Sequence, residues 1–139
     1  MANKVLKPFD VVSAPYTSFD GSIKTNPDGT TQFALFMVLY LDYDNITCAK
    51  ITSWNNPLYL NNSFRLFKAA NPFLRTDSYV QLDKIHTLSV ETCRFIGYVD
   101  KPSRYSIYKI VSGYLTNLAE NLKRFCPVQS EDYVSPNRQ

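Results

Sequence analysis

The chain has 139 residues, a length that suits one compact domain with room for an apolar core. No apolar run approaches the roughly twenty residues of a membrane-spanning helix, and the first residues lack the apolar segment of a signal peptide. The net charge of +3 permits an anionic partner such as nucleic acid without requiring one.

The chain has an odd number of cysteines, and their spacing gives no metal motif. Cys48, Cys93 and Cys126 lie far apart and form neither a Cys-x-x-Cys pair nor a Cys/His zinc pattern. Reduced thiols in a cytosol fit this usage best. We therefore expect a cytoplasmic protein with no bound metal and no other cofactor.

Strand-like segments fill the first half of the chain. Residues 32–41 are a continuous apolar run, typical of a central strand that is buried on both faces. A long polar loop at residues 15–29 precedes this run and holds the turn sequence Asn-Pro-Asp-Gly at 26–29. Strands are expected, in chain order, at residues 9–14, 32–41, 46–53, 58–60 and 64–67.

Residues 78–89 contain the only histidine of the chain. The composition of residues 79–82 predicts a short strand, and the residues after it predict a polar turn with His86 and Thr87 side by side. An imidazole there could transfer a proton near neutral pH. The alternative is a hydrogen-bonded, half-buried or surface histidine without a catalytic role.

The pattern becomes helical towards the end of the chain. A helical turn capped by Ser89 and a strand at residues 96–99 come first, and one long helix is then expected from about residue 102 to 125, with Asp100 as its cap. Its apolar stripe consists of Ile107, Val111, Tyr114, Leu115, Leu118 and Leu122. Residues 1–126 are thus expected to form one domain, a small curled antiparallel barrel with a long C-terminal helix, and residues 127–139 a disordered tail.

Three short motifs follow one another along the chain. They are Phe-Asp-Val at residues 9–11, Ala-Lys-Ile-Thr-Ser at residues 49–53, and the segment 78–89. In this order, and followed by the terminal helix, they resemble the MazF/PemK (Kid) family of toxin endoribonucleases over roughly residues 7–122. The resemblance implies a mainly β fold with an SH3-like barrel, a homodimer and a small antitoxin protein as partner.

The resemblance also implies a reaction. Members of the family cleave single-stranded RNA without metal, because the ribose 2′-hydroxyl attacks the adjacent phosphate and leaves a cyclic phosphate and a 5′-hydroxyl. This chemistry needs a base, an acid and donors to the phosphate. The chain departs from the family at two arginines, whose places are taken by Gln32 and His86, and it retains Thr52.

A candidate site follows from these positions. His86 would act as acid or base, while Thr52 and Gln32 would hold the phosphate. Ordinary strand residues are the alternative for Thr52 and Gln32. The expected RNA-binding residues are Lys24, Thr87, Ser53, Trp54 and Tyr16.

The roles of these RNA-binding residues differ. Lys24 would supply the missing positive charge, and Trp54 and Tyr16 would stack on bases. A solvated lysine and packed aromatic side chains are the corresponding alternatives.

Two functions remain open at this point. The first is a toxin-like endoribonuclease. The second is a barrel of the same fold that has lost its chemistry and inhibits a protein or nucleic-acid target by binding it, as the related CcdB fold does. Loss of the family arginine favours the second function, and the retained Thr52 with the nearby His86 and Thr87 favours the first.

Removing residues 127–139 should leave the melting temperature nearly unchanged, because the segment is polar and contains Pro127 and Pro136. Thermal unfolding of the truncated and full-length chains, followed by circular dichroism, measures the difference. A fall of many degrees would mean that the segment docks on the domain.

Overall fold

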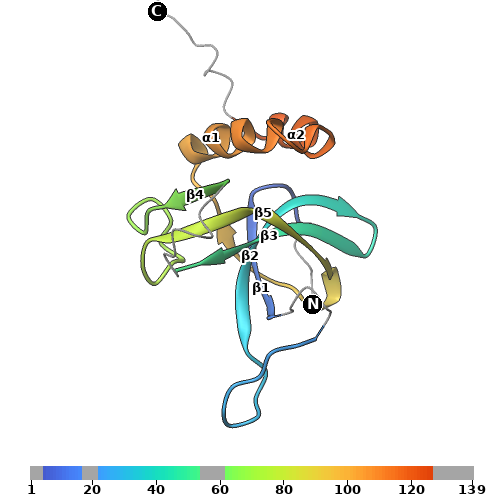
Figure 1. The fold of residues 1–139 in the computed structure, drawn as a ribbon, viewed down its shortest axis with the longest axis vertical. Helices are drawn as coiled ribbons and strands as arrows, with labels where there is room; N and C mark the ends of the chain where they lie inside the picture. The colour runs from blue at the N-terminus through green and yellow to red at the C-terminus, as the bar shows by residue number, and fades with distance from the viewer. Residues whose placement is uncertain (1–4, 17–21, 54–61, 127–139) are drawn as a thin grey trace, which may run out of the picture.

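The computed structural model describes residues 5–16, 22–53 and 62–126, which form six strands and two α-helices (Figure 1). Trp54, the strand expected at 58–60 and the tail at 127–139 lie outside the described residues. The elements are β1 (Asp10–Pro15), β2 (Phe33–Asp42), β3 (Asn45–Thr52), β4 (Ser63–Leu66), β5 (Ser78–Ser89), the 3-10 helix η2 (Val90–Thr92), β6 (Arg94–Tyr98), α1 (Lys101–Ser112) and α2 (Thr116–Lys123).

The strands form one antiparallel sheet in the order β4-β5-β3-β2-β1-β6. The mainly β, antiparallel fold expected from the sequence is therefore confirmed. β4 and β6 stand at the two ends of this order, and no pairing joins them within the described ranges, so a closed barrel stays a prediction. The two helices lie end to end across one side of the sheet (Figure 1).

The sheet is packed on both faces. Met37 and Leu39 of β2 belong to one apolar cluster, which includes Ile107 and Leu122 of the helices. Phe36 and Val38 alternate with them and belong to a second cluster on the opposite face. The prediction of a strand buried on both faces is thus confirmed for the middle of β2, whereas its ends are exposed.

Residues 78–89 form one strand of 12 residues, so the polar turn expected around His86 was wrong. The strand continues because Val80, Leu82 and Leu88 are buried while Asp83 and Thr87 are exposed, and an antiparallel sheet tolerates a polar face in water. His86 lies within β5, directly opposite Cys48 of β3.

The pairing of β3 with β5 is interrupted opposite Lys50. Ala49 pairs with Ile85 and Ile51 pairs with Val80, so the single residue Lys50 faces the four residues 81–84. Such an irregularity bends a strand and redirects side chains beside it. Lys50 therefore lies at the irregularity in the β3–β5 pairing, where such a bend is expected.

Two short helices replace the long helix expected from residue 102 to 125. Asp100 caps α1 as predicted, since its side chain accepts a hydrogen bond from the Ser103 N–H, but α1 ends at Ser112. Gly113 is a poor helix former, and the Tyr114 hydroxyl donates to the Leu82 carbonyl in the sheet, which favours a break here. Among the described residues, no helix is long and apolar enough to cross a membrane.

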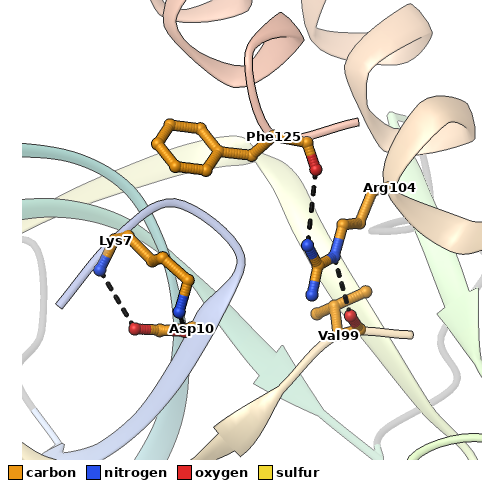
Figure 2. Close-up of polar contacts among 5 residues, drawn as sticks. All are labelled: Lys7, Asp10, Val99, Arg104 and Phe125. Carbon is orange, nitrogen blue, oxygen red and sulfur yellow. Dashed lines mark hydrogen bonds and ion pairs between the residues drawn. The ribbon is translucent and has the colours of Figure 1, made fainter. Parts of the chain in front are cut away.

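A buried arginine fixes the helices to the sheet (Figure 2). Arg104 is 9% exposed; its Nε donates to the Val99 carbonyl at 2.9 Å and its Nη1 to the Phe125 carbonyl at 3.3 Å. Burial lowers the pKa of Arg104, and the charge of Asp10 acts in the opposite direction. One guanidinium thus joins the end of β6 to the chain that follows α2.

A buried asparagine performs a similar task on the loop between β4 and β5. Asn71 is fully buried, and its Nδ2 donates to the Phe67 carbonyl at 3.0 Å and to Asp100 Oδ1 at 2.8 Å. Its Oδ1 accepts the Asp100 N–H at 2.9 Å. The loop is therefore attached to the residue that caps α1.

Replacing this asparagine by leucine should lower the free energy of unfolding by about 3 kcal/mol, because the partners of Asn71 lose their hydrogen bonds inside the protein. Urea denaturation of Asn71→Leu measures the loss. The matched control is Asn117→Leu at an exposed position of α2, which should change stability by less than about 0.5 kcal/mol. Equal effects of the two substitutions would contradict the assignment.

Candidate functional site

Backbone hydrogen bonds bring together three residues of the predicted site, Tyr16, Lys24 and Gln32. Tyr16 N–H donates to the Gln32 carbonyl at 2.7 Å, Lys24 N–H to the Tyr16 carbonyl at 2.8 Å, and Gln32 N–H to the Lys24 carbonyl at 3.0 Å. Tyr16 follows β1 and Gln32 precedes β2, and these two strands are paired antiparallel. The ends of two paired strands thus hold three of the predicted residues together.

The chain between Lys24 and Gln32 is a small hairpin. Thr25 and Thr31 form an isolated bridge, and the Gly29 N–H donates to the Asn26 carbonyl at 2.9 Å. Gly29 has a φ of +86°, which only glycine adopts readily, so the turn predicted from Asn-Pro-Asp-Gly is confirmed. The Asp28 carboxylate accepts hydrogen bonds from Thr30, and these bonds lower the pKa of Asp28.

A groove of about 630 Å³ opens beside this junction. Its other wall comes from the loop before β5, where Phe73 packs so closely on β6 that a Cβ at Gly97 would meet the ring at 2.8 Å. The lining residues are Ser13, Tyr16, Gln32, Phe33, Ala34, Leu35, Lys50, Ile51, Thr52, Ser53, Phe73, Leu74, Arg75, Thr76, Ser78 and Ile96.

Four of the predicted site residues line this groove: Tyr16, Gln32, Thr52 and Ser53. Lys24 does not line it, but Lys24 Nζ lies 5.0 Å from the centroid of the Tyr16 ring, at its margin. These five predicted residues therefore lie together in the structure. Two of them come from the end of β3, and three come from the junction described above.

The other predicted residues lie elsewhere. Thr87 pairs with Thr47 at the opposite end of β3 from Thr52, which is roughly 16 Å away along a strand that rises about 3.3 Å per residue. His86 is not among the lining residues of the groove, and its ring contacts Phe36 edge to face at a centroid distance of 5.5 Å. Trp54 lies outside the described residues.

Lys50 is the main residue that the sequence-based prediction missed. Its Nζ donates a hydrogen bond to the Tyr16 hydroxyl and lies 3.7 Å from the centroid of the same ring. Alternation along β3 puts Lys50 on the same face as Thr52. That spacing, and the fact that Lys50 is the one charged residue of the strand, were the signals available in the sequence.

Arg75 was also missed, and no local signal marks it. It is exposed, and it reaches the groove only because the loop from 67 to 77 folds back on the sheet. Asp77 holds this loop, since its carboxylate accepts the Lys68 N–H at 2.8 Å and Arg65 Nη2 at 3.1 Å. These bonds lower the pKa of Asp77.

Positive charge dominates the surroundings of the Tyr16 phenol. The hydrogen bond from Lys50 lowers the pKa of Tyr16 below its ordinary value of 10.0, and partial burial opposes this shift. The charges of Lys50, Lys24 and Lys84 lower the pKa further. The phenol therefore loses its proton more readily than an isolated tyrosine would.

His86 responds to burial and to the same lysines. Its half-buried position lowers the pKa of the imidazole below 6.5, and the charges of Lys50 and Lys84 lower it further. At neutral pH the ring is therefore uncharged. Among the described residues, no three His, Cys, Asp or Glu side chains gather in a way that could hold a metal ion.

Comparisons with known proteins give a fold and not a sequence family. No family model matches the chain, and no curated protein matches its sequence. Solved structures do match. One, an endoribonuclease in complex with its cognate antitoxin from a mycobacterial species, has a TM-score of 0.56 and 11% identity, over 81% of this chain and 96% of that chain.

A second match is the Mycobacterium tuberculosis toxin MazF-mt6. It has a TM-score of 0.52 and 19% identity, over 75% of this chain and 93% of that chain. The chain has the MazF fold. The resemblance expected from three short motifs is thus confirmed at the level of the fold, and the two matches cover 81% and 75% of this chain, far more than the motifs alone.

His86 should make stability depend on pH on the acid side of neutrality. Because folding lowers its pKa below 6.5, the unfolded chain binds a proton more readily, so stability is greatest above pH 6.5 and falls as the pH drops towards the folded pKa. Urea midpoints of wild type and His86→Gln between pH 7.5 and 5 measure the effect. Plotted against pH, the urea midpoints of the two proteins should have the same slope above pH 6.5, and the wild-type midpoint should fall more steeply below it. Parallel curves below pH 6.5 would contradict the assignment.

Proposed function

We propose that this protein is a MazF-like endoribonuclease that cleaves single-stranded RNA in the groove between Tyr16, Thr52 and Arg75. The observation that carries the proposal is the joining of Lys50, Tyr16, Gln32 and Thr52 in one open groove of a MazF fold. Lys50, Gln32 and Thr52 carry the charge and the hydrogen-bond donors that phosphate chemistry needs.

The charge of the groove suits a polyanion. Lys50 and Arg75 line it, Lys24 stands at its margin, and none of its lining residues among those described is acidic. Cationic side chains that track a phosphate backbone supply most of the affinity for single strands. The lysine in β3 thus offers the positive charge that the chain lacks at Gln32.

The groove also presents apolar surface of the kind that unpaired bases use. Phe33 is 60% exposed although it belongs to a sheet whose centre is buried. Phe73 stands on the opposite wall. Aromatic side chains beside a cationic track bind single strands by stacking, with little demand on sequence. We therefore give Phe33 a stacking role of the kind that we expected of Trp54 and Tyr16.

The polar side chains fit the reaction at phosphorus. Lys50 can stabilise the negative charge that develops on the phosphate, and the Thr52 hydroxyl and Gln32 amide can donate hydrogen bonds to its oxygens. Thr52 and Lys50 lie two residues apart on the same strand face, so both can reach one phosphate. His86 faces the second core cluster beside Phe36, which argues for a structural part.

The setting of the enzyme belongs to the same proposal. The first similar structure holds an endoribonuclease with its cognate antitoxin, and we propose a small antitoxin protein as the partner of this chain too. A homodimer, a cytoplasmic location and cleavage without metal complete the proposal.

Purified protein should cut a mixed-sequence single-stranded RNA in the presence of EDTA and leave cyclic phosphate and 5′-hydroxyl ends. Lys50→Met should lower the rate about a hundredfold, the cost of removing a group that stabilises the transition state. Arg75→Met should weaken binding and reduce the slope of log affinity against log salt by about 0.7, which is one phosphate contact fewer. Gel analysis and fluorescence anisotropy measure the two effects.

Lys109→Met is the matched control, because Lys109 is an exposed lysine on α1 and not a lining residue of the groove. It should change neither the rate nor the salt slope. If wild type leaves every RNA intact and Gln32→Arg does not restore cutting, the nuclease proposal is wrong. A barrel that only binds its target then becomes the better description.

A further inference from the structure

The Tyr16–Lys50 pair has a geometry that phosphate binding alone does not require. Lys50 donates to the Tyr16 hydroxyl, and its Nζ also lies over the ring. The two groups are thus in hydrogen-bond contact inside the groove, and a proton can pass directly between them.

Tyr16 is poorly placed for the stacking role expected from the sequence. Lys50 Nζ occupies one face of its ring at 3.7 Å from the centroid, and Lys24 Nζ lies 5.0 Å from the same centroid. The face that the Lys50 ammonium group covers is closed to a base, which leaves at most the other face of the ring for stacking. The hydroxyl, by contrast, belongs to a residue that lines the groove.

We propose that Tyr16 and Lys50 are the proton-transfer pair of this site, with the Tyr16 phenolate as general base and the Lys50 ammonium as general acid. The inference rests on the proposed ribonuclease function and deepens it. It replaces His86 in the role that the sequence suggested for the imidazole.

The reaction balances without any other reagent. The Tyr16 phenolate takes the proton of the ribose 2′-hydroxyl, whose oxygen forms a bond to phosphorus as the bond from phosphorus to the 5′-oxygen breaks. The Lys50 ammonium gives a proton to the departing 5′-oxygen. The products are a cyclic phosphate and a 5′-hydroxyl, and the proton held by the Tyr16 phenol then passes to the Lys50 amine, which restores both groups.

The electrostatic surroundings favour the starting charges of this pair. The charged groups that act on Tyr16 among the described residues are Lys50 from β3, Lys24 from the hairpin and Lys84 from β5, all cationic, and the pKa of the phenol is lowered accordingly. His86 feels the same lysines and is uncharged at neutral pH. A phenolate beside an ammonium group is therefore stabilised by charge on several sides.

The test uses an RNA that wild type cuts and the same oligonucleotide with a 2′-deoxyribose at the cut position, which binds but lacks the nucleophile. Tyr16→Phe removes one hydroxyl and keeps the ring, so cleavage should fall about a hundredfold or more, while the Kd for the deoxy oligonucleotide should stay within about threefold. Lys50→Arg keeps the charge but cannot act as an acid, so it should bind and fail to cut.

Controls separate this pair from a structural effect. Tyr40→Phe alters another partly exposed tyrosine of the sheet that does not line the groove, and it should cut at the wild-type rate. Lys84→Gln removes a charge near Tyr16 without removing either member of the pair. It should move the acid limb of the pH–rate profile to higher pH, because the phenol then holds its proton more strongly.

The outcomes divide cleanly. If wild type cuts RNA and Tyr16→Phe cuts within about threefold of it, the pair is overturned and the ribonuclease proposal stands. A fully active Lys50→Arg, or a parallel loss of binding and cutting in Tyr16→Phe, also overturns the pair. If His86→Gln abolishes cleavage while Tyr16→Phe does not, the imidazole is the proton carrier. If wild type cuts no RNA and Gln32→Arg does not restore cutting, both the function and the pair are wrong.

Discussion

β2 and β3 carry apolar side chains on both faces of one sheet. A short chain therefore has to cover both faces of the sheet against water. The two helices cover one face, where Ile107, Val111 and Leu122 join the core. The second cluster is built from strand residues such as Val12, Phe36 and Cys48, with Leu6 and the region of η2 beside them. A flat sheet would leave this second cluster in water, so the strands must bend over it. The regular pairing is interrupted by register shifts in β1–β6, β2–β3 and β3–β5, and such irregularities allow strands to bend.

The groove lies beside one of these register shifts. The shift between β3 and β5 lies opposite Lys50, the one basic residue of β3. A half-buried ammonium group costs free energy unless polar or aromatic groups replace its water. Tyr16 provides both through its hydroxyl and its ring. The position of Lys50 thus follows from how the core is packed. Its value for chemistry follows from its contact with Tyr16, which the end of β1 places beside it.

Sequence reasoning worked where the signal is local. The apolar run of β2, the turn before Gly29 and the Asp100 cap each depend on neighbouring residues, and the structure has all three. It failed where tertiary contacts decide. The polar residues around His86 resemble a turn in sequence but occupy the wet face of a long strand. The helix breaks after Ser112, where Tyr114 bonds to the sheet, which periodicity cannot reveal.

The candidate site shows the same division. Thr52 and Ser53 could be found because a motif surrounds them, and both line the groove. Arg75 could not, since its place depends on a loop held by Asp77 and Asn71 at a distance. Lys50 could have been found, because it lies two residues before Thr52 and strand alternation places both side chains on one face. The sequence-based prediction looked for the charge in a loop, at Lys24, and did not consider the lysine within the sheet, which lines the groove itself.

The hairpin between Lys24 and Gln32 separates two things that evolution can alter independently. Its base is fixed by the backbone bonds among Tyr16, Lys24 and Gln32, which involve no side-chain identity at all. Its tip closes on itself through backbone hydrogen bonds of Asn26 with Gly29 and Thr30. Insertions at the tip, and substitutions other than at Gly29, can therefore accumulate at little cost in stability. Related proteins could therefore differ in what the hairpin contacts at the rim of the groove, while the groove itself stays unchanged.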